Sequence, residues 1–178
     1  MNLFVQSLTY FRILAAPILF ILVAYFNFYG LALILFILAS LSDYWDGYFA
    51  RKYTLESELG AVLDPIADKI LVTFLIIALT IELNSIFIGF VGGLILVREF
   101  WVGALRDMNA IKGNRGATIV TQLAKIKTTI QFITFACFLS GLYLENSLII
   151  FLSNFLLFLA LIVTIQTGLS YTIATFKK

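Results

Sequence analysis

Six long apolar runs constrain this chain more than any other feature of its sequence. They lie at about 10–27, 31–52, 61–81, 86–107, 126–144 and 147–172. A helix needs ~20 residues to cross the hydrocarbon core of a bilayer, and each run is near that length. Only 12% of the 178 residues are charged, roughly half the share usual in soluble domains. We therefore predict an all-α integral membrane protein with six transmembrane helices, formed as one domain over residues 1–178.

The connections between the runs differ in length and charge. Those at 27–30, 82–85 and 144–147 are very short and contain no Lys or Arg, so we expect tight antiparallel hairpins. The basic residues gather near the opposite ends of the runs, and the positive-inside rule then places both termini and the two basic loops in the cytoplasm. Residues 2–9 are expected to form a short interfacial helix that leads into the first span.

Composition also excludes several kinds of site. The chain has no histidine, and Cys137 is its single cysteine. This excludes His/Cys metal sites, disulfides and Cys-His nucleophiles. The net charge of +2 is too small to indicate nucleic acid binding. Any metal site in this chain must be made of oxygen ligands.

Four aspartates interrupt the apolar sequence near the predicted cytoplasmic ends of the second and third runs: Asp43, Asp46, Asp64 and Asp68. Within each run the spacing of three or four residues puts both carboxylates on one helical face. If the two faces meet, four carboxylates converge in one pocket open to the cytoplasm. Carboxylates are costly to hold away from water, so such a cluster needs a cation. Hard divalent ions prefer oxygen ligands, and two of them bridged by aspartates suit phosphoryl transfer.

Two other interpretations of the aspartates are open. They can form interfacial salt bridges with the nearby basic residues Arg51, Lys52 and Lys69. They can also be the transit site of a divalent-cation transporter, although all four lie toward one membrane face. Arg12, at the start of the first run, can be either a functional residue or an interfacial anchor.

The aspartate region resembles the signature of the CDP-alcohol phosphotransferases at every fixed position. The matching runs are DYWDGYFAR at 43–51 and, eight residues later, GAVLDPIAD at 60–68. The resemblance implies a six-helix membrane enzyme, usually a homodimer, which transfers a substituted phosphate from a CDP-linked donor to an alcohol and releases CMP. It implies that the four aspartates hold two divalent metal ions, Mg²⁺ or Mn²⁺, and that Asp68 is the general base. The CDP site that it implies comprises Thr9, Asp43, Gly47, Ala50, Arg51 and Gly60.

A second polar cluster begins deep in the fourth run. Arg98 and Glu99 are followed by Arg106, and Lys125 and Lys127 open the fifth run. Buried Arg98 needs an anionic partner, and we expect the adjacent Glu99 to face elsewhere. Arg98 then either pairs with an aspartate of the first cluster or binds the phosphate of an acceptor, for which arginine is well suited. Lys125 and Lys127 lie about 200° apart on a helix, so we expect only one of them to face this pocket.

Three segments narrow the resemblance to a subgroup of the family. The segments LTYFR at 8–12, REFWVGALR at 98–106 and AKIKTTIQ at 124–131 resemble the bacterial phosphatidylglycerophosphate synthases, although that subgroup usually has glycine at the position of Ala124. This implies CDP-diacylglycerol as donor, and sn-glycerol 3-phosphate as acceptor, bound by Arg98, Arg106 and Lys125 or Lys127. It also implies a bacterial cytoplasmic membrane with the active site on the cytoplasmic side. The alternative acceptors are phosphatidylglycerol, as in a cardiolipin synthase, and inositol phosphate.

Overall fold

The computed structural model describes the backbone of residues 2–53, 58–113 and 122–177, and the side chains of residues 7–42, 45, 63–113 and 126–177. Over these ranges the chain forms α-helices joined by short turns, so the all-α prediction is confirmed. The helices are α1 (Asn2–Ala24), α2 (Tyr29–Tyr53), α3 (Glu58–Glu82), α4 (Ile86–Ile111), α5 (Gln122–Tyr143) and α6 (Ser147–Phe176). Residues 2–9 are helical, as expected, but they are the first turns of α1 and not a separate interfacial helix.

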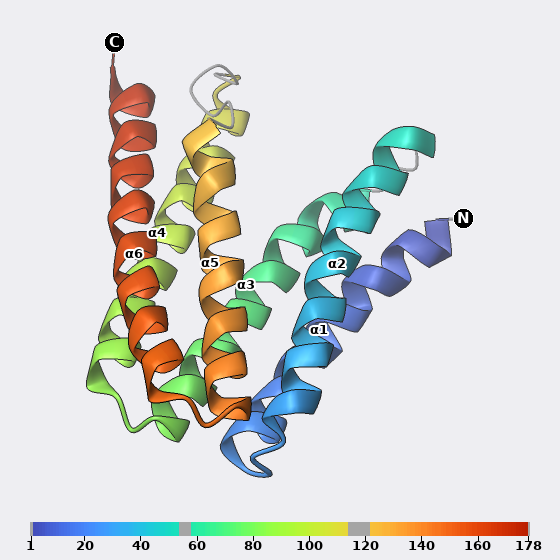
Figure 1. Ribbon diagram of the computed structural model, residues 1–178. Coiled ribbons are helices and arrows are strands. Elements are labelled where there is room, and N and C mark those ends of the chain that lie inside the picture. The colour runs from blue at the N-terminus through green and yellow to red at the C-terminus, as the bar shows by residue number, and fades with distance from the viewer. Residues whose placement is uncertain (1, 54–57, 114–121, 178) are drawn as a thin grey trace.

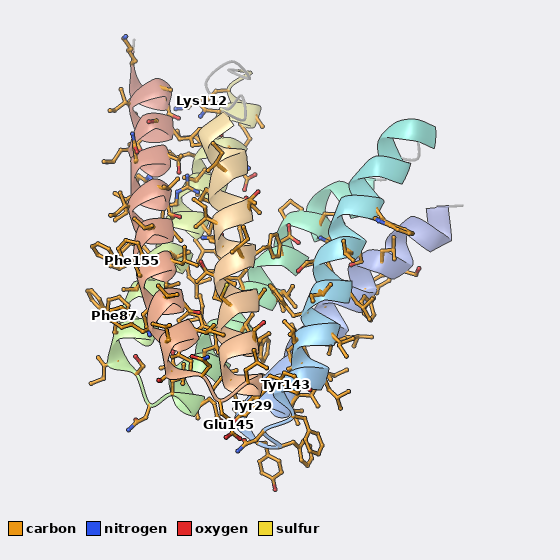
Figure 2. The ribbon with its side chains drawn as sticks, viewed as in Figure 1. Tyr29, Phe87, Lys112, Tyr143, Glu145 and Phe155 are labelled. Atoms are coloured by element: carbon orange, nitrogen blue, oxygen red, sulfur yellow. The ribbon has the colours of Figure 1, made fainter. Side chains whose placement is uncertain are left out.

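The helices have the length and composition of membrane spans. Among the described residues, four stretches are long and apolar enough to cross a bilayer: Ser7–Ala24, Ile86–Ile111, Ile126–Tyr143 and Ser147–Phe176. Helix α2 adds a shorter apolar stretch, Tyr29–Ser42, whereas the first half of α3 carries charged residues. Large apolar side chains such as Phe87 and Phe155 project from the surface of the bundle (Figure 2). The chain is a multi-pass membrane protein, and the count of six spans stays a prediction.

Three tight turns gather at one end of the molecule (Figure 1). Each contains one residue with positive φ, namely Asn27 at 56°, Asn84 at 43° and Glu145 at 50°. A single left-handed residue reverses the chain quickly, and asparagine tolerates this conformation better than most side chains. The helices that each turn joins therefore run antiparallel. Lys112 lies at the opposite end from Glu145 (Figure 2). The end with the three turns, which contain no Lys or Arg, is therefore opposite the end that carries this basic residue.

The helices share one apolar core. Helix α1 packs against α2 and α3, α6 packs against α4 and α5, and contacts of α2 with α5 and of α3 with α4 join the two groups. Every helix contributes side chains with at most 2% of their surface exposed: Leu19, Phe36, Leu75, Ile95, Phe138 and Leu157. The two groups meet near the three turns and lean apart toward the end that holds the N-terminus (Figure 1).

Gly92 sets the close approach of α4 to α3. A Cβ atom at this position would lie 2.4 Å from Ile76 Cγ2, which is closer than real atoms come. The contact continues toward the other end of α4, where Lys69 Nζ lies 5.4 Å from the centre of the Phe100 ring. The charged half of α3 is thereby held beside the part of α4 that carries Arg98 and Glu99.

Candidate active site

Asp64 and Asp68 of α3 converge on Arg12 of α1. Arg12 Nη1 donates to Asp68 Oδ1 at 2.6 Å, and Nη2 donates to Asp64 Oδ1 at 3.1 Å. Thr9, one turn earlier on α1, donates from Oγ1 to Asp64 Oδ1 at 2.6 Å. The spacing of four residues puts both carboxylates on one face of α3, and α1 presents Thr9 and Arg12 to that face.

Arg12 is not an interfacial anchor, so that interpretation of the sequence is wrong. Its side chain has no exposed surface, whereas those of Asp64 and Asp68 are 39% and 42% exposed. A fully buried guanidinium needs anionic partners, and α3 supplies two of them. The interpretation of the aspartates as partners of Lys69 also differs from the structure, where Lys69 lies over Phe100 of α4. The side chains of Arg51 and Lys52 lie outside the described residues.

The structure describes the side chains of only two of the four predicted aspartates, Asp64 and Asp68. The side chains of these predicted donor-site residues lie outside the described part: Asp43, Asp46, Gly47, Ala50, Arg51 and Gly60. Within the part that is described, no group of three or more His, Cys, Asp or Glu side chains is arranged to hold a metal ion. Asp64 and Asp68 offer hard oxygen ligands that are partly exposed, and both carboxylates contact the guanidinium of Arg12. Carboxylate oxygens are ligands that divalent ions prefer, and the convergence of all four carboxylates stays a prediction.

A second charged cluster lies between α4 and α5. Arg98 Nη1 donates to Glu99 Oε1 at 3.0 Å, and Lys127 Nζ donates to the same oxygen. The side chains of Arg98 and Lys127 are only 10% and 9% exposed. Our expectation that Glu99 faces away from Arg98 is wrong. The two Cβ atoms diverge, but both side chains are long enough to meet at the helix surface, where Lys127 of α5 draws Glu99 inward.

Arg106 extends this cluster toward the end of α4. It lies two turns after Arg98 on the same helix, and its guanidinium lies 5.3 Å from the centre of the Tyr171 ring of α6. We call Arg98, Glu99, Arg106 and Lys127 the basic cluster. Its three positive charges exceed its one negative charge by two. Arg98 and Lys127 are almost fully buried, whereas Arg106 is exposed. The side chain of Lys125 lies outside the described residues, and Lys127 is the lysine that the structure brings to this cluster.

Two buried donors in this region have no partner among the described residues. These are Arg98 Nε and Gln131 Nε2, and Gln131 lies one turn beyond Lys127 on α5. Buried donors in proteins are nearly always satisfied, so unpaired ones indicate a site that a ligand or water completes. The basic cluster thus has unused hydrogen-bonding capacity as well as excess positive charge.

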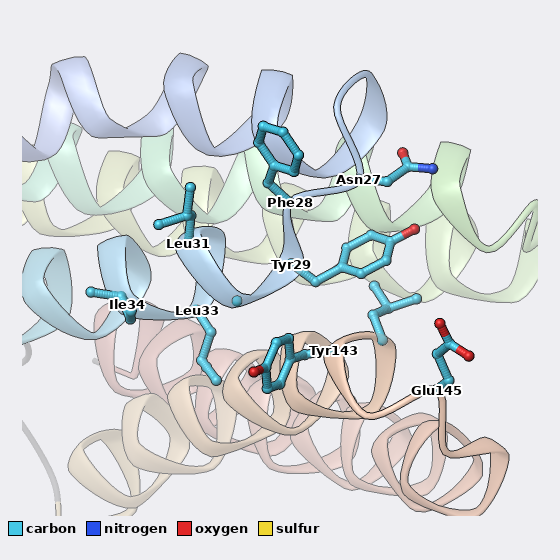
Figure 3. A pocket seen from close by; sticks show the side chains of 10 residues that line it. Asn27, Phe28, Tyr29, Leu31, Leu33, Ile34, Tyr143 and Glu145 are labelled. Carbon is cyan, nitrogen blue, oxygen red and sulfur yellow. The ribbon is translucent and has the colours of Figure 1, made fainter.

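A cavity of about 670 Å³ lies at the other end of the molecule. Figure 3 shows it between the start of α2 and the end of α5, where Tyr29, Tyr143 and Glu145 surround it with apolar side chains. It is far along the bundle from the aspartates and is not the cytoplasmic pocket that the sequence predicts. Much of the wall of that predicted pocket, at residues 43–62, lies outside the described side chains.

Sequence reasoning missed part of this site. A signal for Arg12 was present, since a charged residue inside an apolar run needs a partner, and the i, i+4 aspartates were available. Glu99 had a weaker signal, namely two cations nearby with a single carboxylate among them. Thr167 of α6, which accepts a hydrogen bond from Arg98 Nη2 at 2.6 Å, had none, because threonines are common in membrane helices.

Comparison with known proteins identifies the class of protein that this fold and site define. A family model for CDP-alcohol phosphatidyltransferase matches residues 4–166. The chain belongs to this family and is therefore an enzyme of phosphatidyl transfer.

Individual relatives carry a more specific name. The chain is 39% identical over 170 residues to a CDP-diacylglycerol–glycerol-3-phosphate 3-phosphatidyltransferase of Rickettsia felis, which covers 92% of this chain and 90% of the relative. A protein of the same name from Rickettsia bellii is 41% identical, with the same coverage. The Salmonella typhimurium protein of that name is 31% identical over 167 residues, again 92% of this chain and 90% of the relative.

Proposed function

We propose that this enzyme transfers the phosphatidyl group of CDP-diacylglycerol to sn-glycerol 3-phosphate, giving phosphatidylglycerophosphate and CMP. The observation that carries the choice of acceptor is the net charge of the basic cluster. Arg98 and Lys127 are almost fully buried and share the single carboxylate of Glu99, and this buried excess of positive charge is costly unless an anion joins it. Arg106 adds a further positive charge at an exposed position. A phosphate monoester carries a charge of about −1.5 to −2 at pH 7, which matches the cluster. Free glycerol or serine would leave this charge unbalanced.

The acceptor phosphate is assigned to Arg98, Arg106 and Lys127. Arginine offers a planar pair of donors for phosphate, and Lys127 adds a point charge. Glu99 keeps Arg98 and Lys127 together, so the two cations do not separate when no anion is bound. Lys125 stays a candidate for the same role, because its side chain lies outside the described residues.

The donor site is assigned to the aspartates in the last part of α2 and the first part of α3. Asp43, Asp46, Asp64 and Asp68 would hold two divalent ions, Mg²⁺ or Mn²⁺, which when bound neutralise the pyrophosphate of the donor. Gly47, Ala50, Arg51 and Gly60 are proposed to line the CDP site. Thr9 is proposed to contribute by fixing Asp64, to which its hydroxyl donates.

Asp68 is the proposed general base. Its carboxylate accepts the proton of the acceptor hydroxyl, whose oxygen forms a bond to the phosphorus that carries the diacylglycerol. The bond from that phosphorus to the CMP oxygen breaks, and CMP leaves with the electron pair. Arg12 holds one oxygen of Asp68 in place, so the carboxylate is oriented before the acceptor arrives.

The proposed setting is a bacterial cytoplasmic membrane. Both termini and the active site would face the cytoplasm, where the basic loops lie by the positive-inside rule, and the diacylglycerol tails would stay in the bilayer. The enzyme is proposed to work as a homodimer, with residues 1–178 as a single domain.

The acceptor assignment is tested by product analysis. Purified enzyme is incubated with CDP-diacylglycerol, Mg²⁺ and one alcohol at a time: glycerol 3-phosphate, glycerol, phosphatidylglycerol or inositol phosphate. Mass spectrometry then identifies the lipid formed. We expect phosphatidylglycerophosphate with glycerol 3-phosphate, and loss of turnover when the metal is chelated. Cardiolipin or phosphatidylinositol phosphate as the main product would replace the proposed acceptor.

A further inference from the structure

Helix α6 presents a row of polar groups to the charged half of α4. Besides Trp101, whose Nε1 lies 2.9 Å from Thr172 Oγ1, three donors on α4 each reach an oxygen on α6. Arg98 Nη2 lies 2.6 Å from Thr167 Oγ1, Arg106 Nη2 lies 3.4 Å from the Tyr171 hydroxyl, and Asn109 Nδ2 lies 2.8 Å from Thr175 Oγ1. The first two of these donors belong to the basic cluster, so α6 contacts both of its arginines.

Thr167 is fixed as an acceptor for Arg98. Its hydroxyl oxygen lies 2.9 Å from the Val163 carbonyl and 3.0 Å from the Thr164 carbonyl, so its own proton is directed into the α6 backbone. The lone pairs of Oγ1 are then left for the guanidinium. With 2% of its surface exposed, Thr167 is out of reach of competing water. Arg98 is thereby held at two nitrogens, by Glu99 at Nη1 and by Thr167 at Nη2.

Gly168 provides the space in which the Arg98 side chain lies. A Cβ atom at this position would be 3.0 Å from both Cγ and Nε of Arg98 and 3.6 Å from Cδ. The stem of the arginine therefore crosses the backbone of α6 at a point where any larger residue would push it away. The displaced atoms include Nε, one of the two donors of this region that are buried and have no partner among the described residues.

Tyr171 of α6 contacts the guanidinium of Arg106, as Thr167 contacts that of Arg98. The ring of Tyr171 is 4% exposed and packs with Val102 and Leu105. The Arg106 guanidinium lies 5.3 Å from the ring centre, a distance typical of a cation–π contact. A rigid, buried ring beside a long and otherwise exposed side chain limits where its charge can go.

We propose that Thr167, Gly168 and Tyr171 of α6 are positioning residues for the acceptor subsite, which set the directions of Arg98 and Arg106 toward a phosphorylated alcohol. This inference rests on the proposed function, because it assigns the two arginines to the phosphate of the acceptor. The α6 residues themselves do not touch the substrate. They act by holding the cations of α4 in one arrangement before the phosphate binds.

The Thr167→Val variant tests the proposal. It keeps the shape of the side chain and removes the oxygen that accepts from Arg98. We expect the KM for glycerol 3-phosphate to rise about tenfold or more, as for a lost hydrogen bond to a charged group. The KM for CDP-diacylglycerol should be unchanged, and Thr167→Ser should restore the wild-type value. A wild-type KM for glycerol 3-phosphate in folded Thr167→Val would overturn the inference.

Thr134→Val is the matched control for a purely structural effect. Thr134 of α5 is fully buried, and its hydroxyl donates to the Ile130 carbonyl at 2.7 Å, so the same substitution removes a buried hydroxyl that faces no arginine. We expect Thr134→Val to leave both KM values unchanged. An equal rise in this variant would show that Thr167 acts through stability alone and would also overturn the inference.

A second pair of variants is independent of the hydroxyl. Gly168→Ala should displace Arg98 and raise the KM for glycerol 3-phosphate, whereas Gly93→Ala should not, since a Cβ at Gly93 meets no atom within 4 Å. If Thr167→Val does not fold, this pair decides the question alone. Equal KM values for Gly168→Ala and Gly93→Ala would then refute the proposal.

Failure of the proposed function has a separate signature. It appears in the wild-type enzyme, as turnover without glycerol 3-phosphate or with a different alcohol. The variants are then assayed with the alcohol that the wild type does use. If the KM for that alcohol is the same in Thr167→Val and Gly168→Ala as in the wild type, the proposed role of α6 is overturned, whatever the acceptor is.

Discussion

Arg12 Nη1 lies 2.6 Å from Asp68 Oδ1, and the arginine that makes this contact has no exposed surface. The two residues are 56 positions apart in the sequence. Their contact joins α1 to the half of α3 on which the proposed chemistry depends. A cation built into the protein at this point means that Asp64 and Asp68 are not left as unneutralised neighbours when the donor is absent.

Replacing Arg12 by methionine should destabilise the protein. The variant leaves two carboxylates without the buried cation, and we expect the free energy of unfolding to fall by at most about 3 kcal/mol, because both carboxylates are partly solvated. Thermal unfolding in detergent measures this. Lys112→Met, at an exposed site on the C-cap of α4, is the control and should unfold as the wild type does. Equal stability of the two variants would mean that the ion pairs of Arg12 contribute nothing.

Asp68→Asn should abolish turnover while the protein still folds. The asparagine oxygen can still accept from Arg12, but the amide cannot take the proton of the acceptor hydroxyl. General base catalysis typically contributes a factor of about 10² to 10⁴ to the rate. We expect kcat to fall by at least this factor. Release of CMP is the measurement, with Asp107→Asn at an exposed site of α4 as the control. Activity close to wild type in Asp68→Asn would exclude it as the base.

Lys127→Met should weaken the binding of glycerol 3-phosphate. Loss of one charge-assisted contact to phosphate corresponds to about a ten- to hundredfold rise in KM, with little change in the KM for CDP-diacylglycerol. Lys125→Met is the natural comparison, since the sequence left the two lysines equivalent. We expect the larger effect at Lys127, which contacts Glu99 in the structure. A larger effect at Lys125 would move the acceptor subsite away from the basic cluster.

Gly92→Ala should destabilise the contact between α3 and α4. The added Cβ would overlap Ile76 Cγ2 at 2.4 Å, and overpacking of this kind typically costs about 1–3 kcal/mol. Gly93→Ala adds the same methyl group one position later, where it meets open space, and should be neutral or slightly stabilising. Thermal unfolding of the two variants should therefore separate by several degrees. Identical curves would contradict the close approach of the two helices.

The sequence by itself determined the features that depend on residues near one another in the chain. Apolar runs of ~20 residues predict helices whatever their neighbours are, and the observed ends of α2, α4 and α6 lie within four residues of the predicted ones. The i, i+4 spacing of Asp64 and Asp68 likewise predicts a shared face, and both contact one guanidinium. The convergence of these two with Asp43 and Asp46 stays a prediction.

Only the tertiary structure decided which charges are partners. Hydropathy and spacing identify Arg12 and Arg98 as costly charges in apolar helices, but several anions could neutralise each of them. The choice depends on which helices pack together: α1 beside α3 gives Arg12 its aspartates. On α4, the packing of α6 gives Arg98 its contact with Thr167, and Lys127 of α5 reaches Glu99. Such contacts link residues as many as 69 positions apart, and no local periodicity specifies them. For this reason the sequence could locate the chemistry, whereas the role of α6 emerged only from the packed bundle.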